Sequence, residues 1–544
     1  MTDPVAQLHL AVEEAASAIA DGGLGARPTL ERPKQAGHGD YSTNVAMLLA
    51  PAASAPPREV AERVGAMLRE RLGAALTDVQ VAGPGFLNLV LADGWYGQAL
   101  SHVLEAGERF GAVAPTGETA LVEFVSANPT GPLTAASGRH AAYGDAVARL
   151  LELTGYDVSR EYYFNDAGSQ IMNLGLSIQA RARGEQPPED GYQGDYVREL
   201  AEQIPGAADA TPEDLAAQGV AVLIERIRAT LHDYRVDFDS WFSEARLHPE
   251  GIAKAIERVA EHTYRHDNAL WLRTTTWGDD KDRVLLRSTG EPTYFAADVA
   301  YTLDKLQRGY ALMINVLGSD HHGYVGRLKA IMSALGEDPD RYDVRILQFV
   351  HLVEGASRAG MSKRRGEFVT LDELISEIGV DATRWYMLAR SHDSTIDLDL
   401  ELARKESAEN SVYYVQYAHA RIASVLVKAG EQRVAAALAA TGDAVEGPLE
   451  PAERALVKKL LAFPGEVAEA AAKRAPHRIA AYALDLAQEF TAFYRDCRVV
   501  GAEPEALESF RIALSVATQR TLARSLDLLG VSAPESMRRD SEPE

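Results

Sequence analysis

The segment from Ala127 to Ser137 places a rigid turn between two stretches of different periodicity. Residues 120–125 form an apolar run of strand length, whereas apolar residues recur at helical spacing over 138–153. The turn contains two Pro dipeptides of the strongly turn-forming kind, and a second strand-like run follows at 156–164. The pattern predicts a βαβ unit whose helix N-terminus offers backbone N–H groups to an anion.

A second strand–helix–strand pattern lies further along the chain. Residues 311–317 and 344–352 are apolar runs of strand length, and a helical stretch at 324–335 separates them. With the first unit they predict an α/β fold with a Rossmann-type parallel sheet. An ordinary loop in an α/β protein without a nucleotide site is the alternative for the first turn taken alone.

The chain of 544 residues is long for one core, so the sequence predicts several domains. Residues 1–112 predict a small α/β domain. The parallel-sheet domain is expected over 113–400, with an insertion at about 165–270 that contains a Pro-, Gly- and Asp-rich run. The Ala- and Leu-rich residues 401–544 predict an all-helical domain.

The composition limits which partners the protein can bind and which cellular compartment it is expected to occupy. The 55 Lys and Arg against 79 Asp and Glu give a net charge of −24, which argues against nonspecific coating of nucleic acid. A nucleic-acid partner must therefore meet local basic patches. The single cysteine, Cys497, the lack of an export-type N-terminus and the lack of a long apolar run predict a cytoplasmic protein that does not span a membrane.

Two loops are expected to bring polar groups to the same edge of the sheet. Residues 360–366 place one lysine and two arginines between glycines, as in loops that hold polyphosphate; a solvated charge run is the alternative. Residues 318–322 follow a predicted strand, so their carboxylate and imidazoles suit a ribose and a base. A metal site is the competing interpretation, but further ligands have no obvious source, so no tightly bound protein metal is expected.

These pieces, in this order, resemble the class I aminoacyl-tRNA synthetases, and in detail the bacterial type of arginyl-tRNA synthetase. The segments that carry the resemblance span nearly the whole chain. They are Val122–Leu133, Arg160–Gly168, Gly278–Val284, Thr293–Asp298, Gly318–Tyr324, Met361–Phe368 and Tyr413–Arg421. The resemblance implies that residues 1–112 bind the tRNA elbow, 113–400 catalyse the reaction and 401–544 bind the anticodon.

The resemblance implies an arginine–tRNA ligase that works in two steps. Arginine attacks the α-phosphate of ATP to give arginyl-adenylate and diphosphate, and a terminal ribose hydroxyl of tRNA(Arg) then takes the arginyl group. Magnesium is expected with ATP as part of the substrate complex, and the enzyme is expected to be a monomer. Both steps need stabilised phosphate charge and aligned reactants rather than a covalent enzyme intermediate. A catalytically weak or silent tRNA-binding relative is the alternative.

The resemblance also suggests which residues meet each substrate. ATP would contact Gly131, Pro132, Gly138, Gly318, Asp320, His321, His322, Met361 and Ser362. Arginine would contact Ser126, Asn128, Glu244, Tyr294 and Asp298. The tRNA would contact Tyr413, Gln416, Tyr417 and Arg421. Further candidates for the anticodon arm are Lys458, Lys459, Lys473, Arg474, Arg478, Arg511, Arg520 and Arg524, with Tyr482 as a third stacking ring.

The chain departs from the family at its best-known motif. Where class I enzymes have His-x-Gly-His after the turn, this chain has Thr134-Ala-Ala-Ser137, a loss expected to slow activation by about ten- to a thousandfold. His140 follows three residues after Ser137, so we expect it to return an imidazole to the same helix face while the two hydroxyls act as donors. A plain surface histidine is the alternative. Lys363 and Arg364 complete the expected catalytic set.

Overall fold

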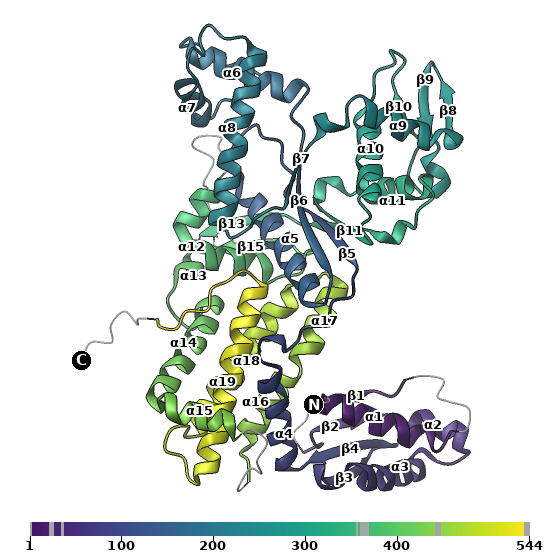
Figure 1. Ribbon diagram of the computed structural model, residues 1–544, viewed down its shortest axis with the longest axis vertical. Helices are drawn as coiled ribbons and strands as arrows, with labels where there is room; N and C mark the ends of the chain where they lie inside the picture. Colours follow the sequence, from purple (N-terminus) through teal and green to yellow (C-terminus); the bar gives the residue numbers. More distant parts are fainter. Residues whose placement is uncertain are drawn as a thin grey trace, which may run out of the picture.

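The computed structural model describes residues 3–20, 27–33, 37–354, 357–358, 369–440 and 448–537, the pair 357–358 by its backbone alone. These residues form a small N-terminal domain, a central domain on a parallel sheet and a helical C-terminal domain (Figure 1). This arrangement confirms the predicted α/β fold class. No helix in these ranges is long and apolar enough to cross a membrane.

Five parallel strands form the central sheet, in the order β12-β11-β5-β6-β7. Their bounds are β5 Thr119–Glu123, β6 Asp157–Phe164, β7 Ser240–Ser243, β11 Leu312–Gly318 and β12 Tyr342–Leu347. The covering helices are α5 Ala135–Leu153, α10 Tyr294–Gln307 and α11 Tyr324–Ala334. The strand order reverses between β5 and β11, so their carboxyl ends form the crevice where open α/β sheets bind ligands.

The expected single insertion at about 165–270 is divided in the structure. β7 lies inside that range and pairs with β6 in the central sheet. Before it comes a helical insertion of α6 Ser169–Ala182, α7 Asp195–Gln203 and α8 Pro212–Asp233. After it come α9 Glu250–Arg258 and a three-stranded antiparallel sheet of β8 Thr263–His266, β9 Ala269–Leu272 and β10 Arg283–Leu286. A strand of only four residues gives too short a pattern to be predicted.

The run expected as one strand at 344–352 is also divided. β12 ends at Leu347, and the chain then begins β13, Val350–Glu354, in a separate sheet with β14 Ser357–Arg358 and β15 Ile396–Asp399. Helix α12, Leu371–Leu388, begins shortly after residue 369, where the described part of the chain resumes. It bends at Gly379, whose φ is 79°. An apolar run alone does not say which sheet its halves join.

The N-terminal domain confirms the predicted small α/β domain. Its antiparallel sheet has the order β1-β2-β4-β3. The strands are β1 Leu30–Glu31, β2 Tyr41–Thr43, β3 Leu76–Ala82 and β4 Phe86–Leu91. Its helices are α1 Pro4–Ser17, α2 Val45–Ala53 and α3 Pro57–Leu72, and α4 Asp93–Ala106 leads toward the central sheet.

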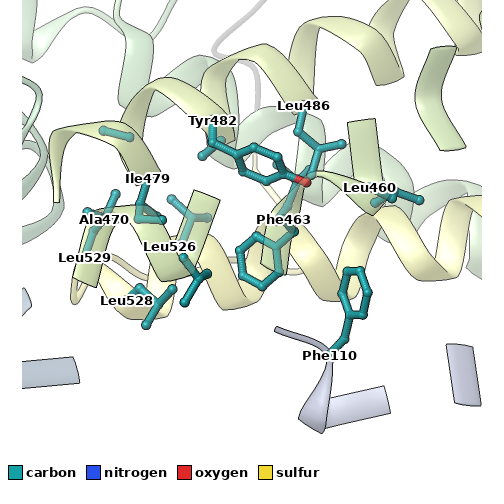
Figure 2. Close-up of a cluster of buried hydrophobic side chains, with 14 of the residues drawn as sticks. Phe110, Leu460, Phe463, Ala470, Ile479, Tyr482, Leu486, Leu526, Leu528 and Leu529 are labelled. Carbon is teal, nitrogen blue, oxygen red and sulfur yellow. The ribbon is translucent and has the colours of Figure 1, made fainter. Parts of the chain in front are cut away.

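The helical domain shares its core with its neighbours. Its helices are α13 Leu400–Arg404, α14 Ser411–Ala429, α15 Glu431–Ala439, α16 Pro451–Leu461, α17 Phe463–Lys473, α18 His477–Asp496 and α19 Glu505–Leu528. Phe110, from the segment after α4, stacks on Phe463 with ring centroids 5.8 Å apart (Figure 2). Buried Arg384 of α12 pairs with Asp145 of α5 and donates to the carbonyl of Leu529. These contacts fix the helical domain against the sheet.

Candidate active site

Strained backbone marks the end of β5. Val125 and Ser126 have φ values of 66° and 42°, in the left-handed region that β-branched valine rarely adopts. The hydroxyl of Ser126 donates to Glu123 at 3.2 Å and accepts from the Tyr163 backbone N–H at 3.2 Å. Asn128 donates to Gln170 at 2.8 Å. Side-chain bonds from the strand and the neighbouring helix therefore hold the start of the turn.

The altered Thr134-Ala-Ala-Ser137 segment forms the first turn of α5. Thr134 is its N-cap, and the threonine Oγ1 accepts from the Ser137 backbone N–H at 3.4 Å. The two hydroxyl oxygens lie 3.3 Å apart. Gly138 packs so closely on Leu371 that a Cβ at 138 would lie 2.7 Å from the leucine Cδ1. The Thr134 hydroxyl thus caps a helix N-terminus, with the Ser137 hydroxyl beside it, and the free N–H groups of such a terminus attract anions.

His140 faces the end of β11. Its Cε1 lies 3.8 Å from where a Cβ on Gly318 would stand, and a Cβ there would approach Asp320 Oδ1 to 2.7 Å. The pKa of His140 is lowered to about 4, chiefly by burial and also by the nearby charges of Arg139 and His321, while Asp320 opposes the shift. The imidazole is therefore neutral near pH 7, a hydrogen-bonding group without charge.

The loop after β11 turns back toward His140. His321 Nε2 lies 3.4 Å from Asp320 Oδ2, and its ring meets Tyr324 edge-on at 5.1 Å. His322 is exposed. Ser319, which the sequence analysis did not single out, has a buried Oγ with no hydrogen-bond partner among the described residues. The structure thus brings together His140, Gly318, Asp320 and His321 from two distant segments.

A carboxylate without a partner lies in the second turn of α10. Asp298 Oδ2 is buried and accepts no hydrogen bond from the described part of the chain. The pKa of Asp298 is raised to about 7, chiefly by burial and also by the charges of Glu244 and Glu123, while Arg327 and Lys305 oppose the shift. A buried carboxylate of this kind is stabilised by a cationic ligand.

The other expected arginine-contacting residues differ in their surroundings. Buried Glu244 accepts from the Tyr163 hydroxyl at 2.5 Å, and His248 Nε2 lies 3.8 Å from Glu244 Oε1. Tyr294 begins α10 and is 65% exposed, so the protein does not enclose its side chain. The sequence does not point to Tyr163 and Arg327, because only the fold brings Tyr163 to Glu244 and the charge of Arg327 close to Asp298.

Other predicted residues lie elsewhere. Met361, Ser362, Lys363 and Arg364 fall outside the described residues. Arg139, in the first turns of α5, is buried and donates to the carbonyls of Gln348, Ser391 and Ser394 at 2.6–2.9 Å. Arg139 therefore joins α5 to neighbouring loops. Among the described residues no group of three or more His, Cys, Asp or Glu is placed to hold a metal ion.

The expected tRNA-contacting residues on α14 separate into two faces. Tyr413 and Tyr417 stack with ring centroids 6.2 Å apart, and the Arg421 guanidinium lies 5.1 Å from the Tyr417 centroid. The Gln416 amide instead donates to Asp381 and to the Ser532 carbonyl, both at 2.9 Å, inside the structure. Tyr413, Tyr417 and Arg421 thus form one aromatic and cationic ladder.

Most of the expected cation cluster is neutralised by ion pairs. Lys458 pairs with Asp40 of the N-terminal domain at 2.9 Å, and buried Arg511 pairs with Glu453 at 2.6 Å. Tyr482 is buried in the core and donates to the Lys459 carbonyl, so it cannot stack on a base (Figure 2). The cations with carboxylate partners are Lys458, Lys459, Lys473, Arg474, Arg478, Arg511 and Arg524.

The fold and the site define the class of protein. A parallel sheet whose switch point carries the Ala127–Leu133 turn and the Gly318–His322 loop, followed by a helical domain, is the architecture of a class I aminoacyl-tRNA synthetase. The Mycobacterium tuberculosis methionyl-tRNA synthetase shares this fold, with a TM-score of 0.53 and 14% identity over 77% of this chain and 92% of that one. Residues 239–425 match the family model for the catalytic domain of class I (R) tRNA synthetases.

The family follows from closer relatives. Residues 6–91 match the arginyl-tRNA synthetase N-terminal domain, and residues 415–537 match the DALR anticodon-binding domain. The arginine–tRNA ligase of Frankia alni is 47% identical over 96% of this chain and 97% of its own length, and that of Bacillus subtilis is 45% identical over 93% and 94%. The chain belongs to the arginyl-tRNA synthetase family.

Solved structures agree with this assignment. The Thermus thermophilus arginyl-tRNA synthetase has a TM-score of 0.75 and 25% identity, covering 99% of this chain and 100% of that one. A putative arginyl-tRNA synthetase from Campylobacter jejuni has a TM-score of 0.76 and 32% identity, covering 82% of this chain and 100% of that one.

Proposed function

We propose that this chain, an arginine–tRNA ligase, binds the guanidinium of its amino acid at Asp298. The observation that carries the proposal is the buried Asp298 carboxylate, which has no described partner and lies close enough to Glu244 for the two charges to interact. A guanidinium offers a planar fork of donors that carboxylates accept well. Ser126 and Asn128, at the end of β5, would orient the α-amino and carboxylate groups.

In the first step, a carboxylate oxygen of arginine forms a bond to the α-phosphorus of ATP as the bond to the diphosphate oxygen breaks. We assign ATP to the crevice between the turn at Gly131, Pro132 and Gly138 and the loop at Gly318. The N-terminus of α5 favours negative charge on the phosphates. Lys363 and Arg364, from the sequence alone, would add positive charge, and Met361 and Ser362 would flank them.

In the second step, a terminal ribose hydroxyl of tRNA(Arg) attacks the arginyl carbonyl. The ester bond forms, AMP leaves as the mixed anhydride breaks, and the hydroxyl proton is released. The chain contributes by holding both reactants in line and by stabilising phosphate charge. The ladder of Tyr413, Tyr417 and Arg421 supports contact with unpaired bases of the tRNA, because rings and guanidinium planes stack on any base.

Further features belong to the same proposal. Magnesium would enter on the phosphates of ATP as part of the substrate. The ligase would act as a cytoplasmic monomer, with residues 1–112 on the tRNA elbow, 113–400 catalysing both steps and 401–544 on the anticodon. The N-terminal match at residues 6–91 and the anticodon-binding match at 415–537 fall inside the first and third of these ranges, and the catalytic match at 239–425 overlaps the second.

Exchange of labelled diphosphate into ATP tests the proposal directly. With arginine and tRNA(Arg) present, the wild-type chain is expected to catalyse exchange and to charge the tRNA. A chain that binds tRNA(Arg) but supports neither reaction would instead be the silent tRNA-binding relative. Lysine in place of arginine is the specificity control, because a carboxylate pair shaped for a planar fork receives a point charge poorly.

Arg421→Gln is expected to weaken tRNA use. The KM for tRNA should rise by about threefold to tenfold, and the slope of log affinity against log salt should fall by about one, because one cationic contact is lost. The KM for arginine should stay at the wild-type value. Lys473→Gln is the matched control, since Lys473 already pairs with Glu469 at 2.6 Å. Equal effects of both changes would contradict a specific role for Arg421.

A further inference from the structure

The helical insertion contacts both segments that border the phosphate site. Figure 1 shows α8 running from the insertion down toward α12, with α7 beside it. One contact joins Tyr196 of α7 to the turn after β5, and another joins Thr230 of α8 to the start of α12. We propose that Tyr196 is a positioning residue through which the insertion holds the phosphate-binding turn in its reactive geometry.

Tyr196 fixes the turn at its tip. The Tyr196 hydroxyl donates to the Thr130 carbonyl with an oxygen–oxygen distance of 2.7 Å. Burial raises the pKa of Tyr196 above its usual value, so the hydroxyl keeps its proton and remains a donor. The ring edge also lies against Gly131, where an added Cβ would stand 3.2 Å from the tyrosine oxygen. The insertion therefore meets the turn by a hydrogen bond and by close packing.

Packing between the turn and the insertion is incomplete. A cavity of about 220 Å³ lies there, lined by Pro132 and Leu133 of the turn and by Leu223 and Ile227 of α8. Tyr196 forms part of the same lining. Because an unfilled space provides fewer van der Waals contacts, packing alone holds the turn less firmly on that side. The Tyr196 bond adds a restraint there.

The second contact reaches the segment that follows the basic segment 360–366 in the sequence. Thr230 Oγ1 donates to Asp372 Oδ2 at 3.1 Å, in the first turn of α12. Just before it, Thr370 forms an antiparallel bridge with Thr134, and the Leu371 N–H donates to the Leu133 carbonyl at 2.8 Å. The turn and the start of α12 are thus one hydrogen-bonded unit. The insertion bonds to this unit twice, through Tyr196 at the turn and through Thr230 at α12.

Tyr196→Phe tests the inference, which rests on the proposed function. The kcat for diphosphate exchange should fall by about three- to tenfold, the loss expected for one neutral hydrogen bond. The KM for arginine and the thermal midpoint should stay at wild-type values, since the ring and its packing remain. Tyr143→Phe is the matched control, because Tyr143 also donates to a backbone carbonyl, that of Arg474, at 2.7 Å, away from the turn.

A second pair of variants tests the other contact. Thr230→Val removes the hydroxyl at nearly constant volume and should lower the same kcat, whereas Thr230→Ser keeps the hydroxyl and should restore it. Wild-type kcat in Tyr196→Phe, or an equal loss in Tyr143→Phe, would overturn the inference. An inactive wild-type chain would instead overturn the proposed function, so the two failures are distinguishable.

Discussion

Asp298→Asn is expected to raise the KM for arginine by about tenfold to a hundredfold, with a smaller effect on the KM for ATP. The substitution keeps the size of the side chain but removes the charge that a guanidinium would meet, and a hydrogen bond to a charged group contributes about 1.5–3 kcal/mol. The Asp298 carboxylate has no described protein partner to lose, so the fold should tolerate the amide. Diphosphate exchange at varied arginine concentration measures the effect.

The pH dependence of the wild-type KM provides an independent readout. Because burial and the charges of Glu244 and Glu123 raise the pKa of Asp298 to about 7, its carboxyl becomes neutral as the pH falls below that value. The KM for arginine should therefore rise on acidification, by up to about tenfold per pH unit. Asp298→Asn should abolish this dependence.

A matched control separates this site from general effects on α10. Asp304 lies in the same helix, is partly exposed and pairs with Arg308 at 2.9 Å. Asp304→Asn should leave the KM for arginine and its pH dependence unchanged. An unchanged KM in Asp298→Asn would remove Asp298 from the arginine pocket.

Much of the fold could be predicted because its elements are long and strongly periodic. The strand over 119–123, the helix over 135–153 and the strand over 157–164 match the predicted unit within a few residues. β7 could not be predicted, because its four residues carry no clear alternation. The separation of β12 from β13 was also missed, since pairing with β15 depends on a contact about 46 residues away along the chain.

The candidate site could be predicted only where its residues directly follow a predicted strand. The turn after β5 and the loop after β11 meet because parallel strands end at the same edge, which strand order alone implies. Ion pairs between distant segments could not be predicted in this way. Lys458 pairs with Asp40, more than 400 residues away along the chain, so the sequence shows the cluster of cations but not the carboxylates that largely neutralise it. The Tyr196 contact with Thr130 likewise depends on how the insertion folds back.

His140→Ala is expected to slow adenylate formation by about tenfold or more, with affinities for arginine and tRNA close to those of the wild type. The altered first turn of α5 offers only hydroxyls at 134 and 137, so we expect the imidazole facing Gly318 to replace the ring nitrogens of the family motif. A charged group is not required for this role. The neutral ring can still hydrogen-bond to a bound nucleotide, and loss of such a contact in the transition state lowers kcat.

The protonation state of His140 gives this prediction its sharpest test. With a pKa lowered to about 4 by burial and by Arg139 and His321, the ring stays neutral from pH 6 to pH 8, so the kcat for exchange should show no step assignable to His140 in that range. His140→Gln, which keeps hydrogen-bonding groups without any charge, should retain much more activity than His140→Ala. If activity instead rose as the pH fell toward 6, an imidazolium would be the active form. Wild-type rates in His140→Ala would leave phosphate stabilisation to the helix N-terminus and to Lys363, whose replacement by Ala would then be expected to abolish exchange.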